Sequence, residues 1–286
     1  MRCDDVLTWR TRDGETVFAW HRGAEHRARA ALCLVHGIGE HSGRYEEVVG
    51  KFNAAGISVY SFDLRGHGES GGRRGHTPSY ASLLDDLARI IEKARGAEGE
   101  TCPVFVWGHS MGGNIALNHA LLRNPPIAGL VVTAPYLRLG FEPSKLDTLL
   151  ARFMNVIAPR YSIETALDTD ALSRVPGVGE AYRADPLTHG FVSARWFVTA
   201  QKAAAFALSH AAELRYPLLL MHGNADRITS VGGSREFAAS LGDRCTYREF
   251  DGAYHELHND TVKDEAYREI LSFIERVSAL PSVHAP

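Results

Sequence analysis

The sequence predicts an α/β fold: a mostly parallel central sheet with helices on both faces, an N-terminal antiparallel hairpin and a helical cap insertion. Three observations support this prediction. The chain has 286 residues, 45% hydrophobic and 23% charged, a composition typical of a globular protein with one large core. Short, continuously apolar runs alternate with longer amphipathic ones, as in a covered parallel sheet. That alternation stops between residues 136 and 215.

The first residues predict the hairpin. Residues 6–10 and 17–21 alternate apolar and polar side chains around Asp13-Gly14, a dipeptide that favours a tight turn. Helical patterns follow later in the chain, at residues 80–94 and from about 261 to 277. The buried strands are expected at residues 30–35, 57–62, 104–107, 130–133, 218–221 and 246–250.

Residues 136–215 predict an insertion that divides the core, which comprises residues 1–135 and 216–286. The insertion shows helical patterns interrupted by prolines and no strand-like run. Its segment 146–157 carries an apolar face that could line a ligand tunnel or rest on a membrane surface. Packing of that face against the core is the simpler interpretation.

Composition also limits the function classes. The net charge is −3 and no long basic block occurs, so nucleic acid is not an expected partner. The cysteines lie far apart and no histidine cluster has metal-ligand spacing, so no metal site is expected. Residues 1–6 are charged where a secretory signal is apolar, and no apolar stretch approaches the roughly 18 residues that span a bilayer. These features predict a cytoplasmic protein.

The candidate nucleophile is Ser110. Strand 104–107 leads into residues 108–112 (GHSMG), and a helical pattern follows. In a G-x-S-x-G turn the serine backbone is strained, and glycines two residues before and after it leave the necessary room. Residues 68–72 (GESGG) match the same pattern but lie between loop-like segments. We therefore predict that Ser70 is a glycine-rich loop residue.

A serine nucleophile needs a base and a carboxylate that orients the base. Asp226 follows strand 218–221, and His255 follows strand 246–250, which are the expected places for the acid and the base. His258 is the rival base, one helical turn further on. Three other histidines lie beside strands and are interpreted as structural: His36, His109 and His222.

Attack on an ester creates an oxyanion that needs hydrogen-bond donors. The backbone amide of Met111, directly after the serine, and that of Ile38, in the glycine loop 36–39, are the expected donors. A plain glycine turn at the end of a strand would explain the glycines of this loop equally well.

Together these motifs resemble the α/β-hydrolase superfamily, and within it the monoacylglycerol lipase and lysophospholipase group. The matching segments are residues 36–45 (HGIGEHSGRY), 63–70 (DLRGHGES), 108–113 (GHSMGG), 225–227 (ADR) and 252–258 (GAYHELH), with weaker matches at 172–174 (LSR) and 185–187 (DPL). The resemblance implies an α/β-hydrolase fold with Ser110 as nucleophile, Asp226 as acid and His255 as base, and with Ile38 and Met111 as oxyanion donors.

The resemblance also implies that Glu40, Arg44 and His258 lie near the pocket for the alcohol leaving group. From the residues alone, Glu40 and Arg44 could equally form a structural salt bridge.

The leading hypothesis is a serine ester hydrolase without a cofactor that cleaves monoacylglycerol to fatty acid and glycerol through an acyl-enzyme. A lysophospholipase or a broad carboxylesterase with the same triad is the alternative. Two remote alternatives are a non-catalytic ligand receptor and a dinucleotide-dependent oxidoreductase, the latter suggested by Gly37, Gly39 and Asp63 near strand ends. The expected partner is a small lipid ester, and transient contact of the cap with a membrane surface is compatible with the sequence. The oligomeric state stays open.

Overall fold

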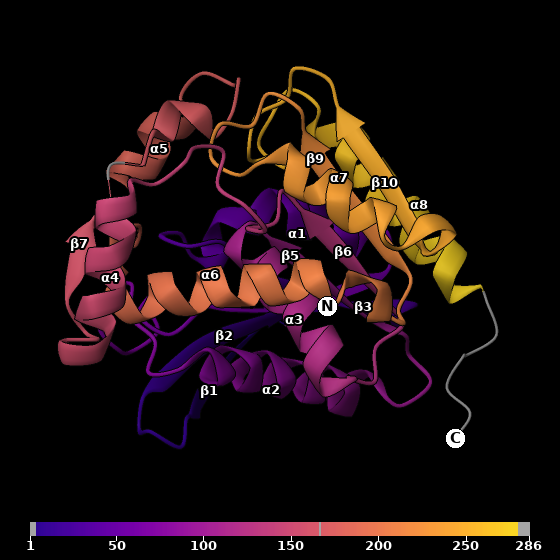
Figure 1. Ribbon diagram of the computed structural model, residues 1–286. Coiled ribbons are helices and arrows are strands. Elements are labelled where there is room, and N and C mark those ends of the chain that lie inside the picture. Colours follow the sequence, from indigo (N-terminus) through magenta and orange to yellow (C-terminus); the bar gives the residue numbers. More distant parts are fainter. Residues whose placement is uncertain (1–3, 166, 280–286) are drawn as a thin grey trace.

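An eight-stranded sheet forms the centre of the molecule (Figure 1). The computed structural model describes residues 4–165 and 167–279, so the other residues of the predicted core and insertion lie outside the described part. The strand order is β1-β2-β4-β3-β5-β6-β9-β10. The six strands from β4 to β10 are parallel, whereas β1 and β2 form an antiparallel hairpin that joins β4. The predicted fold class is confirmed.

The strands lie close to where the sequence predicts them. Their bounds are β1 Asp4–Arg10, β2 Thr16–Arg22, β3 Ala30–Val35, β4 Ile57–Phe62, β5 Val104–His109, β6 Gly129–Thr133, β9 Leu218–Gly223 and β10 Cys245–Phe250. In β3, Cys33 and Val35 join the hydrophobic core on one face of the sheet, and Leu32 and Leu34 join the core on the other. Because both faces are covered, the strand reads as one continuous apolar run.

Helices cover both faces of this sheet. Helices α1 (Glu46–Ala54) and α8 (Lys263–Ser278) pack on one face. Four helices contribute to the core on the other face: α2 (Tyr80–Glu98), α3 (Met111–Arg123), α6 (Ala194–Ser209) and α7 (Val231–Ala239). No helix in the described ranges combines the length and apolar character needed to cross a bilayer.

The predicted insertion holds α4 (Lys145–Ile157), α5 (Val178–Ala184) and α6. Figure 1 shows α4, α5 and β7 gathered on the side of the molecule opposite α8 and β10. Two short strands, β7 (Ser162–Glu164) and β8 (Phe191–Ser193), pair antiparallel there and were not predicted, because three residues show too little alternation. Since α6 also packs against α3, the division into core and insertion stays a prediction.

The apolar face of α4 differs from the simpler expectation. No residue of α4 is buried, and Leu146, Leu149 and Phe153 are 58–74% exposed. The interpretation that this face packs against the core is therefore wrong. A helical period shows that a face is apolar, but it does not identify what covers that face.

Candidate active site

Ser110 occupies a sharp turn between β5 and α3. Its φ is 52° and its ψ −114°, a conformation that costs a residue with a side chain about 1–3 kcal/mol. A Cβ on Gly108 would lie 2.3 Å from the carbonyl oxygen of Gly112, and a Cβ on Gly112 would lie 2.0 Å from that of Val35. The spatial requirement for glycine at both positions is confirmed.

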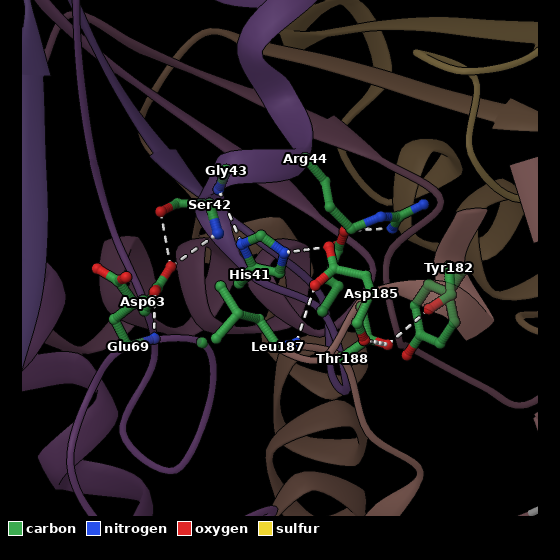
Figure 2. Close-up of polar contacts among 12 residues, drawn as sticks. His41, Ser42, Gly43, Arg44, Asp63, Glu69, Tyr182, Asp185, Leu187 and Thr188 are labelled. Carbon is green, nitrogen blue, oxygen red and sulfur yellow. Dashed lines mark hydrogen bonds and ion pairs between the residues drawn. The ribbon is translucent and has the colours of Figure 1, made fainter.

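The second G-x-S-x-G match has a structural role. The Ser70 hydroxyl donates to the Asp63 carbonyl oxygen at 2.6 Å and accepts from the Phe18 amide at 2.9 Å. The Asp63 carboxylate is buried and accepts from Ser42 and from the Glu69 amide (Figure 2). Ser70 is a loop residue as predicted, and the carboxylate that suggested a ribose site is occupied by the protein's own donors.

The predicted acid and base meet at the carboxyl edge of the sheet, where β9 and β10 are neighbours. His255 Nδ1 lies 2.7 Å from Asp226 Oδ2. The two loops pack tightly, since a Cβ on Gly223 would lie 2.3 Å from the Ala253 carbonyl oxygen. His255 and Ser110 line the same cavity. The structure therefore brings the three predicted triad residues together.

The surroundings of this pair favour a charged acid and a basic imidazole. Burial alone would raise the pKa of Asp226, but His255 and His222 hold it far below its ordinary value. Burial alone would lower the pKa of His255, but the Asp226 charge raises it above the usual 6.5. The hydrogen bond at Nδ1 also fixes the ring, so that Nε2 is the nitrogen left to accept a proton.

His222 is a site residue that the sequence analysis missed. It is fully buried, with Nε2 3.0 Å from Asp226 Oδ2 and Nδ1 2.8 Å from the Ser234 hydroxyl. It therefore contacts the triad acid directly, although its place beside a strand suggested a structural role. Its position four residues before Asp226, at the end of the strand that carries the acid, is the signal that could have revealed it.

The loop after β3 lies directly against the nucleophile. Ile38 lines the cavity with Ser110, and a Cβ on Gly37 would lie 3.2 Å from the Ser110 Cβ. Met111 is the first residue of α3, where helix amides have no intrahelical acceptor. Glu40 Oε1 accepts from the Gly37 amide at 2.6 Å and so fixes the loop. This placement suits both predicted oxyanion donors.

Buried charges stand behind the cavity. Arg44 donates to Glu40 Oε2 at 2.7 Å and to both oxygens of Glu256, at 2.6 and 2.9 Å. The salt bridge that the sequence allowed is present, and Glu40 and Glu256 also line the cavity. His258 stacks on Tyr45 with 4.5 Å between ring centroids. Neither of its buried ring nitrogens has a hydrogen-bond partner within the described ranges.

Two groups of contacts, which we call the cap clasps, join the insertion to the loops of the site. In the first, His41 Nε2 lies 2.8 Å from Asp185 Oδ2, which Figure 2 shows between the core and the insertion. In the second, the Glu256 amide donates to the Leu172 carbonyl oxygen at 2.8 Å, and Arg174 binds Asp260. The clasps contain the two cap segments that matched the family more weakly. Beneath them the cavity at Ser110 has a volume of only about 30 Å³.

Comparison with known proteins agrees with this geometry. The family model described as "Serine aminopeptidase, S33" matches residues 26–262. A monoacylglycerol lipase of Mycolicibacterium smegmatis is 33% identical over 86% of this chain and 88% of its own. The crystal structure of the Paleococcus ferrophilus monoacylglycerol lipase superposes with a TM-score of 0.84 at 34% identity, covering 91% of this chain and 99% of that chain.

One relative is much longer. An uncharacterised abhydrolase domain-containing protein of Dictyostelium discoideum is 34% identical over 93% of this chain, but this chain spans only 28% of that protein. The family match covers most of the chain, including Ser110, Asp226 and His255. The chain therefore belongs to the serine aminopeptidase S33 family of α/β-hydrolase fold and, within it, to the group of the monoacylglycerol lipases.

Proposed function

We propose that the protein cleaves monoacylglycerol to fatty acid and glycerol through an acyl-enzyme on Ser110. One observation carries the proposal: a serine on a strained turn shares a cavity with a histidine that is hydrogen-bonded to a buried carboxylate. The similarity to two monoacylglycerol lipases supports the substrate class.

The reaction proceeds in two balanced halves. His255 Nε2 takes the Ser110 proton as Oγ attacks the ester carbonyl, and the Ile38 and Met111 amides stabilise the oxyanion. The bond to the alcohol oxygen then breaks, and His255 returns the proton to the departing glycerol. Water repeats the sequence on the acyl-enzyme, which releases the fatty acid and restores Ser110.

The buried charges suit the alcohol side of the site. Glu40 and Glu256 line the cavity beside the nucleophile, and Arg44 connects them. Carboxylate oxygens are strong acceptors for the hydroxyl groups of glycerol. We therefore place the glycerol near Glu40 and Glu256, with Arg44 behind them; neither Arg44 nor His258 is among the described residues that line the cavity.

The exposed face of α4 suits transient contact with a lipid surface, the source of this substrate. Leu146, Leu149, Leu150, Phe153 and Ile157 are 53–74% exposed and share one side of the helix. Exposed Lys145 and Arg152 add positive charge for anionic lipid.

Leu149→Ser with Phe153→Ser should reduce co-flotation with anionic liposomes, while activity on a short soluble ester should persist. Undiminished flotation would contradict this contact.

The decisive test is fatty-acid release from monoacylglycerols, lysophosphatidylcholine and short nitrophenyl esters by the native protein and by Ser110→Ala. Strong turnover of monoacylglycerol that disappears in Ser110→Ala is expected. Preference for lysophosphatidylcholine would change the assigned substrate to a lysophospholipid. Cleavage of short esters alone would indicate a broad carboxylesterase. Full activity of Ser110→Ala would show that Ser110 is not the nucleophile.

A further inference from the structure

A second, larger cavity lies away from Ser110 and shares no lining residue with the catalytic one. Its volume is about 360 Å³, within the range of small-molecule sites. Three parts of the chain form its walls: the turn between β1 and β2, the loop that follows β4, and the insertion at residues 159–160 together with Arg195 of α6.

The cavity carries an excess of positive charge. Four arginines line it, but Arg65 is neutralised by Asp13 at 2.8 Å and by buried Asp86 at 2.7 Å. The other charged lining residues are Arg73, Arg160, Arg195 and Glu15. In the part of the chain that the structure describes, Arg73 and Arg160 have no ion-pair partner. Among the described lining residues the four arginines exceed the two carboxylates, Asp13 and Glu15, by two positive charges. Counting buried Asp86 behind Arg65 leaves an excess of one.

His76 lies inside the cavity beside these arginines. Burial lowers the pKa of His76, and the charges of Arg160, Arg195 and Arg73 lower it further. His76 Nδ1 lies 3.0 Å from the Ser193 hydroxyl, so the ring is held in place. A neutral imidazole among three guanidinium groups can donate a hydrogen bond to an anion without adding to their mutual repulsion.

The walls are held by contacts that do not depend on a ligand. Arg195 donates to the Asn155 side-chain oxygen at 2.6 Å and to the Pro78 carbonyl oxygen at 3.0 Å. The Ser193 amide donates to the Gly75 carbonyl oxygen at 2.9 Å. Gly75 has a φ of 64°, and a Cβ there would lie 1.9 Å from the Phe191 carbonyl oxygen. The loop after β4 and the insertion are therefore closely apposed, which reduces the entropic cost of binding.

We propose that this cavity binds a phosphate group, carried either by a small soluble molecule or by a lipid headgroup. Guanidinium groups match phosphate oxygens in geometry and charge, and a tetrahedral phosphate can meet arginines that approach from several directions. Only Pro78 and Pro159 offer apolar side chains among the described lining residues, so an acyl chain finds no wall to cover it. The site thus differs in chemistry from the ester site at Ser110.

Occupancy would connect the two parts of the fold. Arg73 lies on the core loop, whereas Arg160 and Arg195 belong to the insertion. A phosphate held between them ties the insertion to the core through residues that belong to neither cap clasp. Binding to the folded state alone raises the free energy of unfolding by mass action.

The test titrates inorganic phosphate into the protein, against chloride at matched ionic strength, by calorimetry and thermal melting. Saturable binding with a higher melting temperature is expected, both for the native chain and for Ser110→Ala. Arg73→Gln and Arg160→Gln should each weaken binding about tenfold, the effect of losing one charged hydrogen bond. Arg268→Gln, at an exposed arginine of α8 outside the cavity, should bind as the native chain does.

A variant that is expected to bind phosphate more tightly shows that weaker binding in the other variants is not caused by damage to the fold. Glu15→Gln removes the competing carboxylate and should tighten phosphate binding. Vesicles of phosphatidylcholine with and without phosphatidic acid distinguish a lipid headgroup from a soluble phosphate. A lipid headgroup is assigned if binding requires both phosphatidic acid and Arg73 and if inorganic phosphate does not bind. The proposal is overturned if Arg73→Gln and Arg160→Gln bind both ligands as well as the native chain does. It is also overturned if the native chain binds neither ligand.

Discussion

Asp226 is the residue on which the hydrogen bonds of the catalytic edge converge. One carboxylate oxygen accepts from the amides of Ile228 and Thr229, and the other accepts from the Thr229 hydroxyl and contacts both His222 and His255. Such saturation keeps the carboxylate ionised and fixes its orientation. The orientation of His255 therefore depends on the backbone amides and the hydroxyl that hold Asp226 in place.

The pH dependence of ester hydrolysis should follow His255. The base must be neutral to accept the Ser110 proton, and Asp226 raises the pKa of His255 above 6.5. Activity should therefore rise with pH through a midpoint above 6.5, because the protonated form is inactive. The measurement is kcat/KM for a soluble ester between about pH 5 and 9. A midpoint clearly below 6.5 would contradict this environment.

His222→Ala should lower kcat with little change in KM, because Asp226 loses a donor that positions it. The freed carboxylate charge then acts more strongly on His255, so the acid limb of the pH profile should move upward. His222→Gln can place an amide N–H near the original Nε2 and should restore most of the rate. Loss of stability alone would leave the profile of the surviving enzyme where it was.

The residues of the site were predictable to the extent that their signals are local. Ser110 stands in a contiguous turn motif, and Asp226 and His255 each follow a recognisable strand. The bond between Arg44 and Glu256 joins residues 212 positions apart, and only the folded chain shows that Arg44 serves two carboxylates. The contact of His222 with Asp226 was hidden because a histidine beside a strand usually has a structural role.

At the scale of elements, the core strands and the helical character of the insertion were predictable, but the two short strands within the insertion were not. Strands buried on both faces show continuous apolar runs, whereas β7 and β8 are short and their residues are mostly half-buried or exposed. The apolar stripe of α4 could be recognised in the sequence. Its exposure could not, because exposure depends on which neighbouring elements cover the helix. The insertion is also where the family resemblance is weakest, apart from the segments that form the cap clasps.

Asp185→Asn should loosen the first cap clasp. Burial would raise the pKa of Asp185, but the hydrogen bonds from His41 and the Leu187 amide hold it below its ordinary value, so the carboxylate is charged at neutral pH. Removing the charge weakens the bond to His41. Amide hydrogen exchange in α5 should become faster than in the native chain. Glu180→Gln, exposed on the same helix, should leave exchange unchanged.

For the whole molecule, acid should reduce stability by protonating buried carboxylates. Burial alone would raise the pKa of Asp226, Glu256 and Asp260, but His255, Arg44 and Arg174 hold each below its ordinary value. Groups with a lowered folded-state pKa stabilise the protein above their unfolded pKa of about 4, and that stabilisation is lost as the pH falls further.

Urea unfolding at a series of pH values measures this effect. The free energy of unfolding should fall steadily from about pH 5 to pH 3. Asp260→Asn should be less stable than the native chain at pH 7, because Arg174 loses its charged partner, and should show a shallower fall. An equal slope in both proteins would show that Asp260 is not one of the groups responsible.

The strained backbone at Ser110 means that the most stable residue at this position is not the residue that catalysis needs. Glycine adopts a φ of 52° without the penalty that a side chain incurs, so Ser110→Gly should melt a few degrees higher while hydrolysing no ester. Unchanged or lower melting would indicate that the Ser110 side chain contributes as much as its backbone costs. Selection for thermostability alone would therefore favour glycine at position 110. A library of variants screened only for heat resistance would become enriched in inactive proteins.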